Sequence, residues 1–286
     1  MKKGKEGYLF IAPSFIIFMI FTLFPIVKSL IISLFEYDLS SYKWIGINNY
    51  LVLIEDKVFL KALINSFLFA LFNVPLTIIL SLFISITIHP KKEASKSFYR
   101  AAFYLPVVSS IVTITLIWKW IYHPIFGILN FIIENIGFNR INWLGDYDFA
   151  FPALVIVLLT ISIGQPILLY VASLGSIPKT YYEVGRIEGV NRLQEYRYIT
   201  WPLLKPTTLY ILVMTTIASF QTFAIVQLMT GGGPFYTTST IVYQLYTTAF
   251  DFVKLGLASA MGIILTLIIV LISVFQFKFL STDIEY

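Results

Sequence analysis

Long apolar runs alternate with short polar segments along this chain. A run of about 20 apolar residues is long enough to cross a bilayer as a helix. Six such runs can be drawn, covering approximately residues 8–33, 62–88, 99–122, 151–174, 207–229 and 257–280. The pattern therefore predicts an all-α polytopic membrane protein with six transmembrane helices, and we expect residues 1–286 to form a single transmembrane domain.

The composition agrees with this pattern and excludes several classes of site. The chain is 58% hydrophobic and 12% charged, with a mean hydropathy of +0.84, which is too apolar for a soluble domain of this size. It has no cysteine, which excludes disulfides and cysteine-ligated metals, and its two histidines, His89 and His123, are far apart in sequence. The net charge of +5 resides mostly in loops. We expect neither a metal site nor a nucleic-acid partner.

The distribution of basic residues predicts the orientation in the membrane. Loops on the cytoplasmic side carry an excess of lysine and arginine. The richer set of ends holds Lys2, Lys3, Lys5, Lys91, Lys92, Lys96, Arg100, Lys179, Arg186, Arg192, Arg197, Lys205 and Lys278, and the poorer set holds Lys43, Lys57, Lys61, Arg140 and Lys254. We expect the richer set, including both termini, to be cytoplasmic.

The longest charge-rich run, Tyr181–Pro206, lies between the fourth and fifth apolar runs. We call residues 175–206 the charged loop. A polar segment held between two membrane spans must face water, so we expect it to bind a soluble partner. Pro202 and Pro206 are expected to separate it from the next span.

Capping residues divide the charged loop into two predicted short helices. Thr180 and Glu183 have the spacing of a capping box, and Gly189 can close that first helix with a positive φ. Asn191 with Gln194 offers a cap for the second helix. Gly185, in the middle of the first helix, indicates that another surface approaches the backbone closely.

Two segments on the expected external side are also informative. The apolar segment around residues 129–136 is too short to span the bilayer and is expected to lie along its surface. Gly231–Pro234 lacks the downstream Gly-Lys-Ser/Thr of a phosphate loop, so we interpret it as a sharp turn.

Polar groups within the apolar runs are candidates for a transport path. In the second run, Asn73, Pro75 and Thr77 either line a path or join helices by hydrogen bonds. In the fourth run, Ser162 and Gln165 flank Gly164, next to Pro166. A broken helix at such a point lines a cavity or forms a packing kink, and we give both interpretations equal weight.

The fifth run has the richest set of such groups. Thr215, Ser219 and Thr222 share one helical face by their spacing, beside Phe220 and Gln221. Hydroxyls and amides next to aromatic rings suit a sugar, which has polar edges and apolar faces. The alternative is hydrogen bonding between helices, and we prefer the lining role.

Several motifs resemble those of a known family. Glu183, Gly189, Ile199 and Pro202 stand at the spacing of the cytoplasmic EAA loop of bacterial ABC importer permeases, although Val184 and Gly185 replace its two alanines. The Gly231–Pro234 turn, together with the first external loop and the third run, resembles the carbohydrate-type (maltose- and oligosaccharide-like) members. The later residues that carry this likeness are Tyr243, Ala249, Phe250 and Gly256.

The resemblance covers nearly the whole chain and implies a function. It implies a permease subunit in the bacterial cytoplasmic membrane that imports a sugar, paired with a second homologous permease, two ATPase subunits and an extracytoplasmic solute-binding protein. ATP and Mg would be bound by the ATPases, with no cofactor in this chain. Glu183 would cap its helix and also face a basic group on an ATPase. The implied ATPase-coupling residues are Glu183, Val184, Gly185, Arg186, Gly189 and Val190.

Other functions remain as alternatives. A secondary sugar transporter driven by protons or sodium would need an intramembrane acid, and no Asp or Glu lies within the six runs. Sodium coupling through backbone carbonyls is not addressed by this pattern. A membrane enzyme would need a catalytic set, which His123, Asp146 and Asp148 do not form. A permease for glycerol phosphate or another polar solute is a further alternative.

Overall fold

The computed structural model describes residues 5–38 and 40–280. Lys2, Lys3 and the polar tail Ser281–Tyr286, which we expect on the cytoplasmic side, lie outside the described residues. The described part is mostly helical, with one two-stranded sheet. It divides into two compact units, Met1–Leu60 with Gln244–Leu267 and Lys61–Tyr243 with Ile268–Tyr286.

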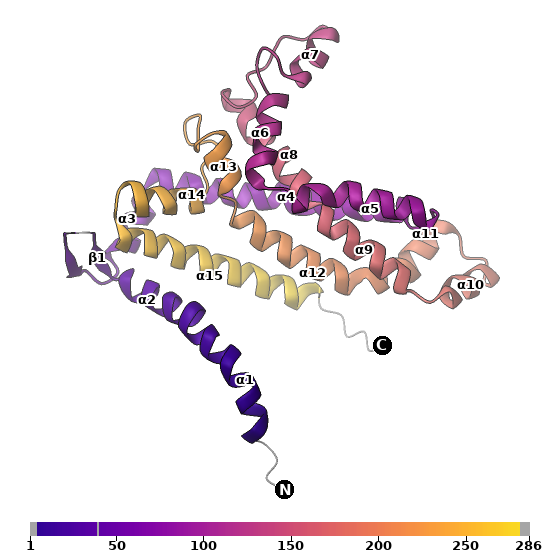
Figure 1. Ribbon diagram of the computed structural model, residues 1–286, viewed down its shortest axis with the longest axis horizontal. Helices are drawn as coiled ribbons and strands as arrows, with labels where there is room; N and C mark the ends of the chain where they lie inside the picture. The colour runs from indigo at the N-terminus through magenta and orange to yellow at the C-terminus, as the bar shows by residue number, and fades with distance from the viewer. Residues whose placement is uncertain (1–4, 39, 281–286) are drawn as a thin grey trace. The chain divides into compact units, whose positions relative to one another are not determined.

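The first unit begins with a long apolar helix. Helix α1 (Lys5–Phe18), the π-helical turn η1 (Met19–Leu23) and α2 (Phe24–Ile32) follow one another without a break (Figure 1). Residues Phe10–Ile32 are long and apolar enough to cross a membrane, and none of the most apolar window is buried inside the protein. Within its own unit, this helix therefore leaves most of its side chains exposed.

A small hairpin and a short helix complete the start of this unit. Strands β1 (Phe35–Tyr37) and β2 (Tyr42–Trp44) pair antiparallel, with Phe35 opposite Trp44. In α3 (Asn48–Glu55), the buried Asn49 amide donates to the Ser33 and Phe35 carbonyls at 2.8 and 2.9 Å. In α15 (Leu255–Leu280), a Cβ on Gly256 would collide with the Phe35 carbonyl, so glycine permits this close approach. The unit also contains the second half of α14 (Ile241–Tyr246) and all of η3 (Thr247–Asp251).

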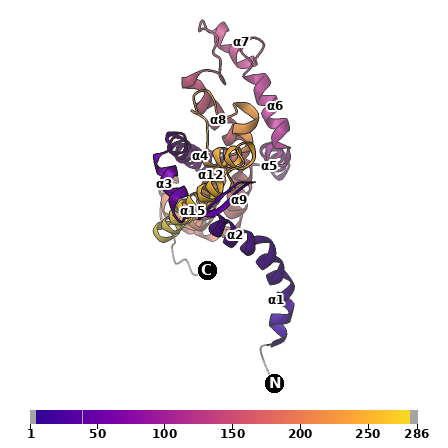
Figure 2. The same cartoon turned by 90° about the vertical axis from the view of Figure 1, so that its left-hand side faces the viewer.

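The second unit is a helical bundle built around α4 (Lys57–Ile88). Phe69 of α4 packs with buried residues of α6 (Ile111–Ile121), α8 (Tyr147–Ser162) and α13 (Ala224–Met229). Leu82 of α4 packs with Tyr170 of α9 (Gly164–Ser176) and with Leu204 of α12 (Trp201–Phe220). In both views α7 (Ile128–Asn135) lies at the far end of α6, away from α9 and α12 (Figures 1 and 2).

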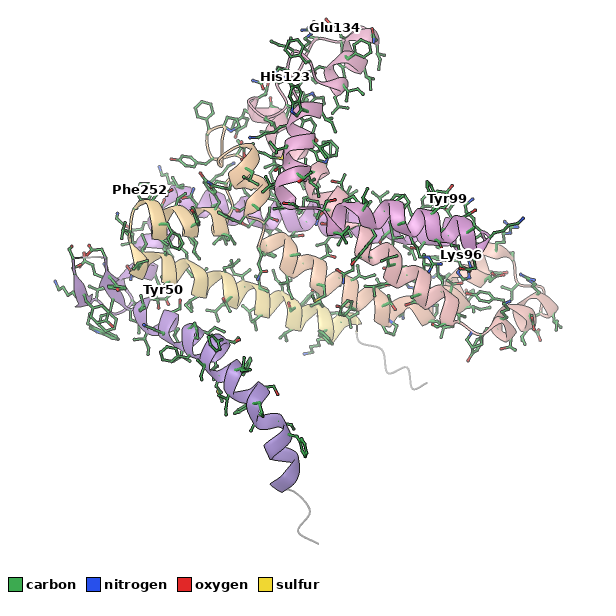
Figure 3. All side chains as sticks on the ribbon, in the orientation of Figure 1. Tyr50, Lys96, Tyr99, His123, Glu134 and Phe252 are labelled. Carbon is green, nitrogen blue, oxygen red and sulfur yellow. The ribbon has the colours of Figure 1, made fainter. Side chains whose placement is uncertain are left out.

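The third apolar run differs from the single helix that the sequence predicts. Helix α5 (Glu93–Val108) and α6 meet at an angle of 100°. Ser109 and Ser110 have extended backbones, which end one helix and start the next, and Pro106 weakens the last turn of α5 by removing a donor. Lys96 and Tyr99 lie on the part of α5 remote from this bend, while His123 and Glu134 follow α6 (Figure 3).

The fourth and fifth runs are also divided. Helices α8 and α9 meet at 42°, so the break predicted around Gly164 is confirmed. A Cβ at Gly164 would lie 2.5 Å from the Phe103 carbonyl oxygen of α5, which explains why α5 and α9 come so close. The fifth run is not continuous to Met229, because α12 ends at Phe220 and α13 begins at Ala224.

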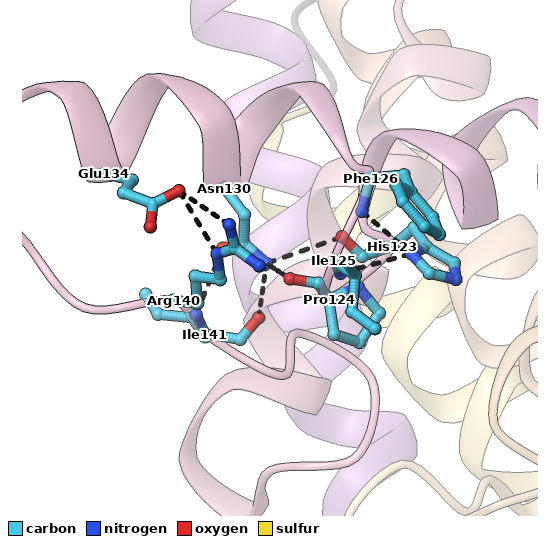
Figure 4. A network of polar contacts seen from close by, with 8 residues as sticks. All are labelled: His123, Pro124, Ile125, Phe126, Asn130, Glu134, Arg140 and Ile141. Carbon is cyan, nitrogen blue, oxygen red and sulfur yellow. Dashed lines mark hydrogen bonds and ion pairs between the residues drawn. The ribbon is translucent and has the colours of Figure 1, made fainter.

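The segment that contains α7 is held by one buried side chain. The Asn130 amide group donates to the Pro124 and Ile141 carbonyls at 3.1 and 2.8 Å, and its oxygen accepts from the Ile141 N–H (Figure 4). An ion pair between Arg140 and Glu134 closes the outer part of the loop at 3.0 Å. The apolar segment around residues 129–136 forms most of the short helix α7. Its position along a membrane surface stays a prediction.

Candidate functional site

The first helix that lies wholly within the charged loop is α10 (Lys179–Ile187). The predicted capping box of Thr180 and Glu183 is wrong. Pro178 occupies the N-cap, no side chain caps the helix, and Thr180 already lies in the first turn. The predicted C-terminus is confirmed, since Gly189 has a φ of +76° and the Val190 N–H donates to the Gly185 carbonyl at 2.9 Å. Glycine suits this left-handed position.

The second half of the charged loop joins α12 directly. Helix α11 (Arg192–Glu195) begins with the predicted Asn191–Gln194 capping box, in which both reciprocal bonds measure 2.9 Å. The π-helical turn η2 (Tyr196–Thr200) then leads into α12, so Arg192–Phe220 forms one helix of 29 residues. The expectation that Pro202 and Pro206 separate loop from span is wrong. Pro202 lies in the first turn, and the wider π turn precedes it.

Gly185 is buried where α10 meets this second half. A Cβ there would lie 3.1 Å from the Ile199 Cδ1 atom, so the close surface that the sequence predicts is provided by Ile199. Helix α10 thus packs on the following turn through a contact that leaves little room for a side chain.

The exposed side of α10 carries a run of apolar side chains. Tyr181, Val184 and Ile187 are 53%, 57% and 84% exposed, and their spacing of three places them along one side of the helix. We call these three residues the apolar ridge. Glu183 is exposed beside it. An apolar stripe on a helix in a charged loop is the usual mark of a surface that another protein covers.

A cleft of about 800 Å³ lies behind α10 and is lined by charged residues. Its charged lining consists of Lys179, Glu183, Arg186, Arg192 and Glu195, with His89 at the end of α4. Among the described residues, Glu183 makes no ion pair or side-chain hydrogen bond, so its carboxylate is available to a partner. Burial, together with the nearby Lys96 charge, lowers the pKa of His89 below its ordinary value.

The polar groups within the bundle meet at Asn73. This fully buried amide of α4 donates to the Ser162 hydroxyl at 3.2 Å and to the Ser219 hydroxyl at 3.0 Å, and it accepts from Thr77 at 3.4 Å. We call these four residues the Asn73 cluster. It joins α4, the end of α8 and the end of α12, so the hydroxyls of Ser162 and Ser219 serve contacts between helices in this conformation.

The other candidate path residues divide into buried and exposed groups. Thr215 and Thr222 are buried, and Phe220 is 1% exposed and contacts Phe67 edge-on. Gln165 and Gln221 are exposed, next to the breaks that end α8 and α12. The structure therefore brings Ser162 and Ser219 together and leaves the two glutamines as the accessible amides.

Several residues of the site are absent from the set inferred from sequence. Of the two interpretations that the sequence offers for Asn73, the structure shows the hydrogen bonds between helices, and the sequence does not indicate its partners because they lie 89 and 146 residues away in the chain. Tyr181 and Ile187 are the ridge residues that were missed, and their helical spacing was the available signal. No group of three or more His, Cys, Asp or Glu in the described part of the chain is placed to hold a metal ion.

Comparison with known proteins identifies relatives along nearly the whole chain. Residues 54–285 match the model of the family described as binding-protein-dependent transport system inner membrane component. The probable ABC transporter permease protein YurN of Bacillus subtilis (strain 168) is 33% identical over 283 residues, covering 97% of each chain. The sn-glycerol-3-phosphate transport system permease protein UgpA of Agrobacterium fabrum is 31% identical, covering 98% of this chain and 96% of that protein.

Two further similarities concern a sugar permease and a solved structure. The lactose transport system permease protein LacF of Rhizobium radiobacter is 30% identical, covering 95% of this chain and 93% of that protein. A chain in the crystal structure of a bacterial ABC transporter involved in the import of the acidic polysaccharide alginate superposes with a TM-score of 0.82 at 23% identity. That match covers 95% of this chain and 93% of the other, and it concerns the fold.

Proposed function

The chain belongs to the family of binding-protein-dependent transport system inner membrane components, and on this premise we propose that it moves a sugar or oligosaccharide inward as one permease subunit of an ATP-driven importer. It is a multi-pass inner-membrane protein and, by its family, a transport subunit rather than an enzyme. The names of LacF and UgpA support a sugar or a related polar solute such as glycerol phosphate.

The proposed assembly has four kinds of partner. A second homologous permease completes the membrane path, two cytoplasmic ATPase subunits bind ATP and Mg, and an extracytoplasmic binding protein delivers the solute. Both termini and the charged loop are on the cytoplasmic side in this proposal, in accord with the excess of lysine and arginine there.

The observation that carries the coupling proposal is the apolar ridge of α10. Burying a Val, Ile or similar side chain stabilises a contact by about 1.5–3 kcal/mol. The three ridge side chains therefore supply a substantial part of an ATPase interface. Glu183, exposed beside the ridge and without an ion pair among the described residues, would meet a basic group of the ATPase and fix the register.

The continuous helix from Arg192 to Phe220 supplies the mechanical link. A helix of 29 residues is about 44 Å long. When ATP draws the ATPases together, α10 and α11 move with them, and α12 carries that displacement to its far end. Ser219 lies at that end, inside the Asn73 cluster.

The Asn73 cluster is suited to rearrangement during this movement. Interhelical hydrogen bonds in membranes contribute on average about 0.6 kcal/mol each. Two such contacts, from Asn73 to Ser162 and Ser219, hold the ends of α8 and α12 in place but are weak enough to exchange in each cycle. In this proposal the exposed amides of Gln165 and Gln221 line the path and bind solute hydroxyls, while Thr215, Ser219, Phe220 and Thr222 shape the wall behind them.

The first test is to isolate the assembly. The chain is tagged at its C-terminus, extracted from native membranes in mild detergent, and the proteins that come with it are identified. We expect a second permease and an ATPase in stoichiometric amounts. If the chain is recovered alone or as a homodimer, the importer proposal fails and a self-contained transporter replaces it.

A second test examines coupling in the same assembly. Gly189→Asp places a side chain at the left-handed position that closes α10. We expect the variant to assemble and hydrolyse ATP but to lose solute uptake, because α10 no longer transmits the movement. Glu183→Gln should weaken uptake in the same direction. Normal uptake by Gly189→Asp would contradict the coupling role of this turn.

A further inference from the structure

The loop between α13 and α14 presents two aromatic side chains at its tip. We call residues 230–240 the glycine loop. Phe235 and Tyr236, just after Gly231–Pro234, are 85% and 51% exposed. The loop follows the end of α12 that is remote from the charged loop, so it faces outward if the charged loop is cytoplasmic.

Both aromatic residues have an unusual backbone conformation. Their φ angles are +45° and +60°, in the left-handed region that side chains other than glycine rarely adopt. Strain of this kind persists only when the surrounding structure imposes it, and it is concentrated at binding sites. Glycine at either position would relieve the strain, so the aromatic side chains themselves have a use that offsets it.

The surrounding structure does impose this conformation. The buried Asn65 amide of α4 donates to the Tyr236 and Ser239 carbonyls at 2.7 and 2.9 Å. The Thr238 hydroxyl donates to the Gly233 carbonyl at 2.7 Å. The Ser66 hydroxyl accepts from the Ile241 N–H at 2.9 Å. The tip is thus held rigidly before any partner arrives, which lowers the entropic cost of binding.

These contacts also indicate which kind of partner covers the tip. Irregular backbone is tolerated at membrane depth only where protein buries it or where it lines a water-filled space. The base of this turn, Thr237–Thr240, is buried in the protein, so Phe235 and Tyr236 are the part of the loop that a partner can reach. Exposed aromatic side chains on a rigid support are typical anchors of protein interfaces. The family to which the chain belongs is described as binding-protein-dependent, and in the proposed function that binding protein delivers the solute on the external side.

We propose that Phe235 and Tyr236 form a docking contact for the solute-loaded extracytoplasmic binding protein. This inference rests on the proposed function and adds the residues that receive that partner. The rigid tip inserts two rings into an apolar recess of the binding protein, while the hydrogen-bonded base of the loop stays unchanged.

The test measures how the binding protein stimulates the purified importer. The assembled transporter is placed in lipid nanodiscs, and ATP hydrolysis is followed as the binding protein of the same system, loaded with its solute, is added. For Phe235→Asp we expect the concentration giving half-maximal stimulation to rise at least tenfold, with basal hydrolysis unchanged. The matched control is Phe252→Asp, which alters an equally apolar, 67% exposed residue with an ordinary φ of −97° and should leave the curve in place.

A second variant separates docking from folding. Tyr236→Gly relieves the backbone strain, so we expect the thermal unfolding temperature to rise or hold while stimulation weakens several-fold. If Tyr236 had only a structural role, its replacement would lower both the unfolding temperature and the stimulation of ATP hydrolysis. An unchanged stimulation curve for both variants would overturn the inference. So would loss of the second permease from Phe235→Asp, because the tip would then face that subunit.

The same measurements distinguish failure of this inference from failure of the proposed function. If the wild-type assembly contains an ATPase but the binding protein does not stimulate it, the proposed function itself is wrong. Because the chain has no cysteine, Phe235→Cys also offers a single labelling site. An environment-sensitive dye there should change its emission on addition of the binding protein, and emission typical of a bilayer before addition would overturn the inference.

Discussion

The apolar ridge of α10 consists of apolar side chains that are exposed, whereas the Asn73 cluster consists of polar side chains inside the helical bundle. The ridge exposes Tyr181, Val184 and Ile187 on a charged loop, whereas the cluster buries Asn73 among apolar helices. Neither arrangement follows the simple rule that apolar groups are inside. The described residues do not cover the ridge, whereas the Asn73 side chain finds its hydrogen-bond partners within the cluster.

The difference shows where each region obtains its stability. The cluster is complete within one chain, so its contribution is present before assembly. The ridge contributes only when a partner buries it. Exposed apolar surface outside the membrane thus indicates an interface, while buried polar groups inside the bundle indicate a connection between helices.

The largest effect should come from a charge on the ridge. Ile187→Asp places a carboxylate at an 84% exposed apolar position. Losing the burial of this side chain should cost about 1.5–3 kcal/mol, or about tenfold or more in affinity. Co-purification of the ATPase measures this, with the chain still present in the membrane. Lys179→Gln, on the other face of α10, is the control, and undiminished recovery of the ATPase with Ile187→Asp would contradict the ridge as an interface.

A change at Asn73 should have a smaller effect of a different kind. Asn73→Leu removes two donated hydrogen bonds, but Ser162 and Ser219 keep their own bonds to the Leu158 and Thr215 carbonyls at 2.8 and 2.7 Å. We expect a loss of about 1–2 kcal/mol in stability, measured by thermal unfolding, with ATPase binding unchanged. Asn73→Asp should cost more, because its carboxylate offers no donor to either serine. Equal stability of the wild type, Asn73→Leu and Asn73→Asp would show that the cluster does not hold α4, α8 and α12 together.

The turn that closes α10 should respond more modestly. Gly189→Ala adds a side chain at a φ of +76°, which costs about 1 kcal/mol. Asparagine tolerates this conformation better, so the stability of Gly189→Asn should lie between that of the wild type and that of Gly189→Ala. Hydrogen exchange of the Val190 amide, which donates to the Gly185 carbonyl, reports this locally. Identical exchange in the three proteins would refute the strain at this turn.

The smallest expected effect concerns pH. Burial and Lys96 lower the pKa of His89 in the folded protein below the unfolded value of 6.5, although Glu93 opposes the shift. The unfolded chain therefore binds more protons, and the contribution of His89 is present above pH 6.5 and is lost as the pH falls through the folded pKa. His89→Gln should flatten the fall in unfolding temperature between about pH 7 and pH 5. An unchanged slope would show that His89 does not titrate on unfolding.

Local features of the chain could be predicted from sequence, whereas features set by distant contacts could not. Gly189 and the Asn191–Gln194 box depend on nearby residues, and both are confirmed. The Thr180–Glu183 box also has the right spacing, but Pro178 takes the cap position first. The bend of 100° at Ser109 and Ser110 was missed, because an apolar run shows length and not direction.

The candidate site divides along the same line. The charged loop was evident from its polarity, because charge cannot be hidden between two spans. The hydrogen bonds of Ser162 and Ser219 could not be predicted from sequence, because both serines bind Asn73, which lies in another helix. Pro202 and Pro206 were expected to end the loop, yet the π turn before α12 keeps the helix continuous, and such a turn has no clear signature in sequence.

The sharp bend between α5 and α6 has a consequence for how the protein is made. Helix α5 has 16 residues and α6 has 11, lengths of about 24 and 17 Å against a hydrocarbon core of about 30 Å. Neither half can therefore cross the bilayer as an independent straight segment. Helix α5 packs closely against Gly164 of α9, so its final position depends on a helix that is synthesised more than fifty residues later. We therefore expect α5 and α6 to reach their final place in the membrane only after α9 has been synthesised, so that assembly of the membrane domain is cooperative.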